Sequence, residues 1–187
     1  MPLPLLVVQA LPVAEWQLSA SALQLDGSVS ADAGDITLAL SDNSGTVNFA
    51  LTSTVQAATG FVQTAGAAVQ LPATIEVARG PISIQAPASS TNGALSLATS
   101  GLISLAGLSA AQSIVRMNAG TGAINVGTAN SSAALSLVVG ELQVGTAGSA
   151  SLYGSIVGQG GAIAASHITS PLVGSPYFMN GTPWGPA

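Results

Sequence analysis

Residues 95–105 read LSLATSGLISL and contain the same short pattern twice, as Leu95-Ser96-Leu97 and as Ile103-Ser104-Leu105. In each copy two apolar residues flank one small polar residue. Alternate side chains of a β-strand face opposite sides of a sheet, so this alternation indicates a short, half-buried strand. Between the two copies, Ser100-Gly101 is typical of a corner where the chain turns.

The same alternation recurs along much of the chain. Further copies are Ile36–Leu40, Val47–Leu51, Ile75–Val77, Ile82–Ile84, Ile124–Val126, Leu135–Leu137, Leu142–Val144 and Leu152-Tyr153. No window carries the apolar i, i+3, i+4, i+7 stripe of an amphipathic helix, so long helices are not expected. The pattern weakens between Thr52 and Leu71, where Ala, Thr and Gln dominate.

The spacing of these runs predicts how they stack. From Leu95 onward they begin near residues 95, 103, 114, 124, 135, 142 and 152, so pairs of runs repeat roughly every 20 residues, a period typical of solenoids. We therefore predict an all-β fold, a right-handed parallel β-helix with about 20 residues per turn and two or three short strands in each turn. An antiparallel sandwich or barrel is the alternative, because it also shows short strands at regular spacing. The scarcity of hairpin signals between runs favours the β-helix.

The two ends of the chain differ in composition from its middle. We assign residues 1–25 to an apolar N-terminal cap or connector, residues 26–165 to the solenoid and residues 166–187 to an extended tail rich in proline. Proline cannot donate a hydrogen bond to a sheet, so we expect the tail to be extended without being a strand. The candidate residues for capping or assembly are Leu5, Val7, Val8, Tyr177, Phe178 and Trp184.

Charge is scarce throughout the chain. Only 5% of the residues are charged, and Arg79 and Arg116 are the only basic residues apart from His167. A nucleic-acid interface needs a basic surface, so we exclude one. The absence of cysteine excludes disulfides and cysteine-based zinc sites. No apolar segment approaches the roughly 20 residues of a membrane helix, so we expect no membrane span.

The chain also contains few titratable residues that could act in catalysis, and we expect neither an enzyme nor a bound cofactor. His167 is the single histidine, and we interpret it as a polar residue of the tail rather than as a general base or a ligand. The acids Asp26, Asp32, Asp35 and Asp42 form the one acidic concentration. Asp32 and Asp35 are the calcium-ligand candidates within it, and the alternative is that these acids simply cap turns.

Two phrases near the C-terminus resemble a known group of proteins. Residues 150–162 read ASLYGSIVGQGGA, and Tyr177-Phe178-Met179-Asn180-Gly181 follows in the proline-containing tail. Together with GAINVGT at residues 122–128, they resemble the C-terminal region of filamentous-haemagglutinin-like and autotransporter-passenger-like β-helix exoproteins of bacteria. This resemblance implies an extracellular or bacterial-surface location.

An exterior of Ser, Thr, Asn, Gln, Ala and Gly is neutral and able to form hydrogen bonds, which favours contact with copies of the same chain or with polysaccharide. We therefore expect a non-enzymatic structural or adhesive protein that assembles with itself into a filament or array. A glycan-binding module of the adhesin type is the alternative. A β-helix enzyme that cleaves polysaccharide is the third hypothesis.

Overall fold

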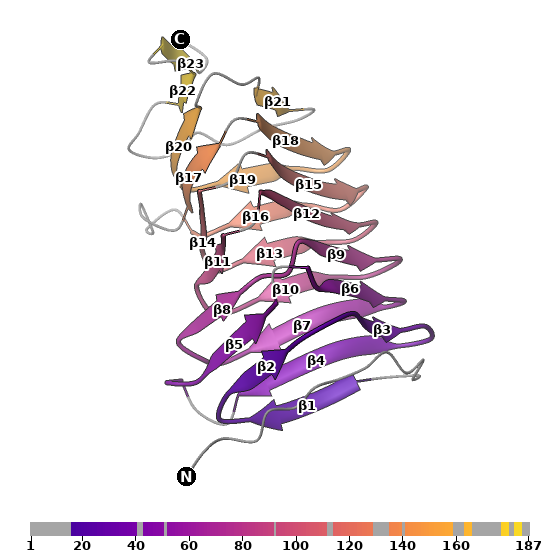
Figure 1. The fold of residues 1–187 in the computed structure, drawn as a ribbon. Coiled ribbons are helices and arrows are strands. Elements are labelled where there is room, and N and C mark those ends of the chain that lie inside the picture. Colours follow the sequence, from indigo (N-terminus) through magenta and orange to yellow (C-terminus); the bar gives the residue numbers. More distant parts are fainter. Residues whose placement is uncertain are drawn as a thin grey trace.

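The protein forms a coil of parallel strands. The computed structural model describes residues 16–40, 43–50, 52–91, 93–111, 114–128, 135–139, 141–158, 163–165, 177–179 and 182–184. Within these residues the chain contains β-strands joined by short connecting segments, and no helix. Three successive strands complete one turn, and about six turns of about 22 residues stack along the axis (Figure 1). The predicted β-solenoid is confirmed.

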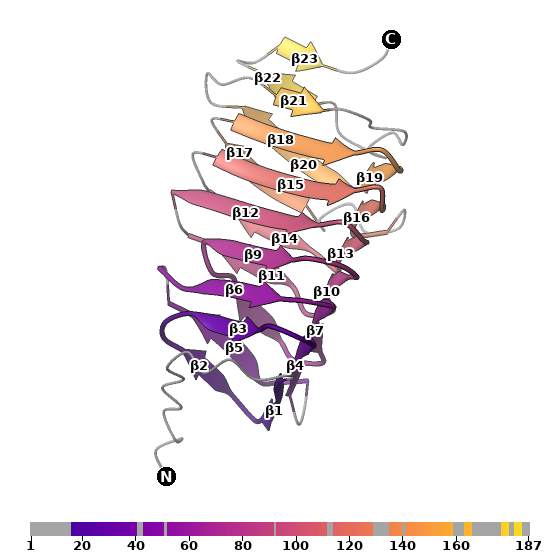
Figure 2. The same ribbon diagram turned by 90° about the vertical axis from the view of Figure 1, so that its right-hand side faces the viewer.

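The strands are distributed over three sheets, which the chain visits in a constant order. Figure 2 shows sheet 3 toward the viewer, with sheet 1 at the right. Sheet 1 contains β1 (Trp16–Ala20), β4 (Asp35–Leu40), β7 (Gly60–Thr64), β10 (Ile82–Ile84), β13 (Ile103–Leu105), β16 (Ile124–Val126) and β19 (Ala150–Leu152). Sheet 2 contains β2 (Leu23–Leu25), β5 (Thr46–Phe49), β8 (Ala68–Gln70), β11 (Ala88–Ser90), β14 (Leu108–Ala110), β17 (Leu135–Val139), β20 (Gly154–Gly158), β22 (Tyr177–Met179) and β23 (Thr182–Trp184). Sheet 3 contains β3 (Val29–Ala31), β6 (Thr54–Ala57), β9 (Thr74–Val77), β12 (Ala94–Thr99), β15 (Ile114–Gly120), β18 (Glu141–Thr146) and β21 (Ile163–Ala165).

Strand pairing distinguishes the solenoid from the antiparallel alternative. Strands of successive turns pair in parallel, for example β10 with β13 and β13 with β16. Among the described strands only β22 and β23 pair antiparallel. An antiparallel sandwich is therefore excluded.

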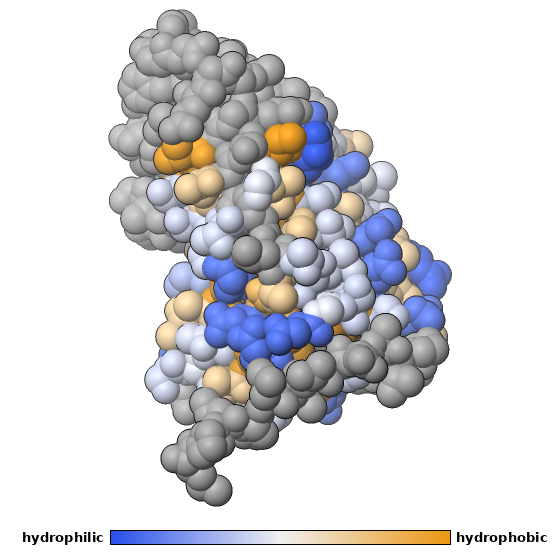
Figure 3. Space-filling model, in the orientation of Figure 1, coloured by the Kyte–Doolittle hydropathy of each residue, from blue (hydrophilic) through white to orange (hydrophobic). Residues whose placement is uncertain are grey.

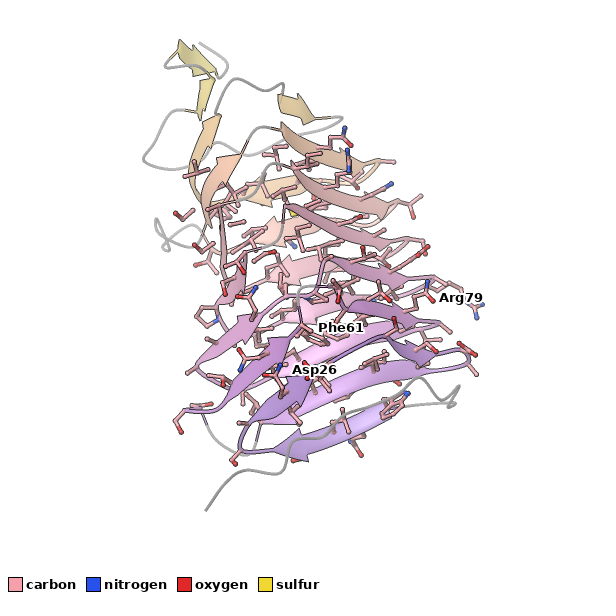
Figure 4. All side chains as sticks on the ribbon, in the orientation of Figure 1. Asp26, Phe61 and Arg79 are labelled. Atoms are coloured by element: carbon pink, nitrogen blue, oxygen red, sulfur yellow. The ribbon has the colours of Figure 1, made fainter. Side chains whose placement is uncertain are left out.

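The core consists of columns of apolar side chains that repeat at one position in every turn. In sheet 1 one column contains Ile36, Phe61, Ile82, Ile103, Ile124 and Ala150, so that successive turns advance the chain by 25, 21, 21, 21 and 26 residues. All six residues are buried. Phe61 lies inside the coil (Figure 4), with its ring centroid 6.3 Å from that of Phe49. Burial of these columns is the main apolar contribution to stability.

One corner of the coil, between sheets 3 and 1, is built from stacked glycines. Gly80, Gly101, Gly122 and Gly148 each lie two residues before a strand of sheet 1. A Cβ at Gly122 would overlap the carbonyl oxygen of Gly101, and one at Gly101 or Gly148 would overlap the carbonyl of the glycine one turn earlier. Thr99 adds a side-chain hydrogen bond to the Gly80 carbonyl at 2.6 Å. The corner thus admits no side chain, because backbone rests directly on backbone.

The stretch of weak alternation between Thr52 and Leu71 nevertheless contributes a full turn, β6, β7 and β8. Its pattern is obscured because Gln63 occupies an inward position and is fully buried. The Gln63 side chain donates to the carbonyl of Ala65 and accepts from the backbone N–H of Ala86 at 3.0 Å. A polar residue is tolerated there because both ends of its amide are paired.

Both ends of the solenoid differ from the boundaries expected from the sequence. β1 and β2 already pair with β4 and β5, so the coil includes residues 16–25, which we had assigned to the cap. In the tail, β22 pairs with β20 and with β23. Pro183 is compatible with β23 because this strand ends the sheet, where an N–H need not face a neighbour.

The glycine corner generates a stability prediction. Gly122→Ala should lower the free energy of unfolding by about 1–3 kcal/mol or more, as overpacking does, because its Cβ meets a backbone carbonyl. Gly93→Ala is the matched control, since a Cβ there has no neighbour within 4 Å. Urea unfolding followed by circular dichroism measures both variants. Equal midpoints for the two variants would contradict the stacked corner.

Candidate functional site

The outward residue of each strand lies above that of the strand before it, so each sheet carries columns of outward side chains. In sheet 2 the central column consists of Gln24, Asn48, Gln70, Ser89, Ser109 and Ser136. Neighbouring strands lie about 4.7–4.9 Å apart, which sets the repeat of the column along the axis. Every one of these residues is polar and uncharged.

Gln24, Asn48 and Gln70, which we name the amide column, occupy three consecutive turns. Figure 3 shows strongly hydrophilic residues gathered over β2 and β5. The Gln24 amide donates to a carboxylate oxygen of Asp26 at 2.9 Å. The Asn48 amide donates to the hydroxyl of Thr46 at 3.4 Å. These bonds orient the amides while leaving Asn48 exposed.

Gln70 differs from the other two amides in how well its side chain is satisfied. Its oxygen accepts a hydrogen bond from the Ser89 hydroxyl at 3.1 Å. Its nitrogen Nε2 is covered and has no hydrogen-bond partner among the described residues. A covered, unpaired donor costs about 1–3 kcal/mol. The amide column therefore contains one group whose hydrogen bonding is incomplete.

Sheet 3 carries a different feature, an open depression of about 300 Å³. Its polar lining consists of Asp32, Gln56 and Glu76, and four alanines complete it. Asp32 and Glu76 are distant in sequence and both line this depression because β3, β6 and β9 stack in consecutive turns, with β6 between them. The described residues of the lining include no basic one.

The structure separates the two calcium candidates. Asp32 faces the depression, whereas Asp35 begins β4 and accepts a hydrogen bond from the Thr37 hydroxyl at 3.0 Å. Among the described residues no three or more acids or histidines are grouped as metal ligands would be. Asp26 is engaged with Gln24, and Asp42 lies outside the described residues. Of the described acids, only Asp32 and Glu76 are placed in the lining of the depression.

The other residues selected from the sequence are only partly placed. Leu5, Val7, Val8 and His167 lie outside the described residues. Tyr177, Phe178 and Trp184 belong to β22 and β23, and their side chains are not among those described. Arg79 projects outward (Figure 4), and Arg116 donates to the side-chain oxygen of Gln143 at 3.0 Å.

The amide column was not predicted from the sequence, although the sequence contains a signal for it. Each amide is the middle residue of an apolar triplet: Leu23-Gln24-Leu25, Val47-Asn48-Phe49 and Val69-Gln70-Leu71. Such a middle position faces outward whenever its flanks face the core. Amides at this position in successive turns predict a column once the strand order is known.

Comparison with protein-family models, curated proteins and solved structures finds no match for this chain. In the part of the chain that the structure describes, no helix could cross a lipid bilayer.

Gln63, whose side-chain amide is fully paired, and Gln70, whose amide nitrogen is unpaired among the described residues, allow a matched test of how hydrogen bonding affects stability. Gln63→Leu should lower the free energy of unfolding by about 1–3 kcal/mol, because it leaves the Ala86 N–H without its acceptor. Gln70→Leu should leave stability unchanged or raise it, because it removes the unpaired Nε2. Urea midpoints of the two variants provide the comparison. A larger loss in Gln70→Leu than in Gln63→Leu would contradict this account.

Proposed function

We propose that this chain is a non-enzymatic structural or adhesive solenoid that assembles end to end with copies of itself into a filament or array outside the cell. The resemblance of residues 122–128, 150–162 and 177–181 to filamentous-haemagglutinin-like and autotransporter-passenger-like exoproteins supports the extracellular or bacterial-surface setting. The parallel coil is the architecture that this resemblance implies.

The observation that carries the proposal is the open N-terminal end of the described coil. β1, β2 and β3 are the terminal strands of their sheets, and on the far side none pairs with another described strand. Unpaired backbone groups at a strand edge are a template for pairing with another chain. Three such edges at one end form a surface on which a further turn can stack.

The side chains at this end also favour association. Trp16 and Leu18 occupy inward positions of β1, yet both are only partly buried against the core. The Trp16 indole donates to the backbone carbonyl of Ser30 at 2.8 Å, which ties β1 to β3. This end of the coil is therefore partly apolar, and the hydrogen bond already restrains the Trp16 side chain, which lowers the entropy that docking of a second copy must cost there.

Parallel winding gives the coil two unlike ends, which determines the type of assembly. The N-terminal end of one copy would meet the C-terminal end of the next, where β19 and β21 terminate sheets 1 and 3. Such a head-to-tail contact is heterologous and yields an open filament unless its rotation closes a ring. The net charge of −5 opposes this contact only weakly, since physiological salt screens charges beyond about 8 Å.

The non-enzymatic part of the proposal rests on the described polar groups. The depression on sheet 3 is lined by Asp32 and Glu76, and its described lining includes no Lys, Arg or His. An enzyme that cleaves polysaccharide by elimination needs a base and charge stabilisation at the same site. The outward column of sheet 2 offers hydrogen bonds instead, which suits contact rather than chemistry.

A charge at the N-terminal end of the coil tests the assembly. Leu18→Lys should convert concentration-dependent oligomers into monomers, because an ammonium group at the end of the coil must lose water when a second copy docks. Ser104→Lys is the matched control, because it adds the same charge to the outer side of a central strand. It should leave assembly intact.

Sedimentation velocity over a range of concentrations measures both variants, and circular dichroism checks that each is folded. A wild-type chain that stays monomeric at every concentration would contradict the proposal. A folded Leu18→Lys variant that assembles as the wild type does would contradict it equally.

A further inference from the structure

We propose that the outer face of sheet 2 binds a neutral, extended polysaccharide along the amide column, with about one sugar unit facing each turn of the coil. The site consists of Gln24, Asn48 and Gln70 and continues over Ser89, Ser109 and Ser136. It lies on the outer face of the coil, although it begins at Gln24 on the terminal strand β2, and its side chains point outward rather than along the axis on which copies would stack. The proposal therefore holds whether or not copies of the chain stack end to end.

The repeat of the column selects the kind of chain that fits it. Outward groups recur every 4.7–4.9 Å along the axis, the spacing of neighbouring strands. This spacing is comparable to the length of one pyranose unit in an extended β-linked glycan, so each sugar lies beside one position of the column. A peptide strand advances by only about 3.2–3.4 Å per residue and loses register after a few turns. A polysaccharide is thus the better match.

The chemistry of the column suits hydroxyl groups. Each side-chain amide provides both donors and an acceptor, and each sugar hydroxyl also donates and accepts. The hydroxyls of Thr46 and Ser89 lie beside the amides, because they are hydrogen-bonded to Asn48 and Gln70. Neighbouring positions therefore offer several hydrogen bonds to each sugar, which gives orientation as well as affinity.

The charge of this face indicates that the ligand is neutral. The charged residue Asp26 is hydrogen-bonded to Gln24 of the column, and none of the six column residues is basic. A sulfated or uronic-acid polysaccharide would place its anions near the Asp26 carboxylate without a cation to pair with. The carboxylate of Asp26 can instead accept hydrogen bonds from neutral hydroxyls.

The incomplete hydrogen bonding of Gln70 adds a gain that is realised only on binding. Its Nε2 is covered and lacks a partner among the described residues. A rotation of this amide toward a ligand oxygen would give Nε2 the acceptor that it lacks. A donor that has no partner before binding gains a whole hydrogen bond from the ligand. A donor that was already bonded to water gains less, because it must first give up that bond.

Titration calorimetry of the full chain with β-1,4-linked glucose oligomers tests the site. Affinity should rise from the disaccharide through the tetrasaccharide to the hexasaccharide, because longer chains meet more turns. Hyaluronan, an acidic polysaccharide, serves as the charged comparison and should bind more weakly or not at all. No binding of the hexasaccharide, or tighter binding of hyaluronan, would overturn the proposal.

Two asparagines in equivalent outward positions locate the binding face. Asn48→Ala should weaken hexasaccharide binding about three- to tenfold, the loss expected for one hydrogen bond. Asn125→Ala removes the same amide from the outer side of sheet 1 and should change affinity less than twofold. Equal losses in the two variants would overturn the assignment to sheet 2.

Ser109→Lys provides a second probe of the same column if Asn48→Ala does not fold. Ser109 is exposed on β14, so the substitution leaves the amides in place and puts a bulky side chain in the path of the glycan. It should reduce hexasaccharide affinity while Ser104→Lys, on sheet 1, does not. Unchanged affinity in a folded Ser109→Lys variant would overturn the proposed path.

Discussion

The structure depends on one constraint, that each turn of backbone must lie directly on the turn before it. At the corner between sheets 3 and 1 this contact leaves no space for a side chain, which is why Gly80, Gly101, Gly122 and Gly148 stack there. With the corners held in line, the strands of successive turns pair in parallel and the residues between them fall into columns. Inward columns form the core, and outward columns form long, regular surfaces.

Much of the fold could be predicted from alternation alone, because runs such as Ile82-Ser83-Ile84 have apolar residues only where the side chain faces inward. The turn from β6 to β8 was obscured because Gln63 faces the core, its amide paired with Ala65 and Ala86. The register could not be predicted, since the step between paired residues of sheet 2 varies from 19 residues (Val69 to Ala88) to 27 (Leu108 to Leu135).

The candidate site depends on that register, which is why the sequence did not reveal it. Gln24, Asn48 and Gln70 are unremarkable surface residues until the pairing of β2, β5 and β8 places them in one column. Asp32 and Glu76 likewise line one depression only through the stacking of β3, β6 and β9. The scarcity of charge, by contrast, is a property of composition, and the outward column of sheet 2 agrees with it, because all of its residues from Gln24 to Ser136 are polar and uncharged.

The central claim is that residues far apart in sequence lie on straight columns along one axis, and pulsed electron-electron double resonance measures this directly. Because the chain has no cysteine, spin labels can be attached to two pairs introduced by Thr37→Cys with Ser151→Cys and by Asn48→Cys with Ser136→Cys. These pairs span five steps of sheet 1 and four steps of sheet 2. The strand spacing predicts narrow distance distributions between the labelled backbone positions, centred at about 24 Å for the sheet 1 pair and at about 19 Å for the sheet 2 pair. Broad distributions, or distances that do not scale with the number of turns, would contradict the stacked coil.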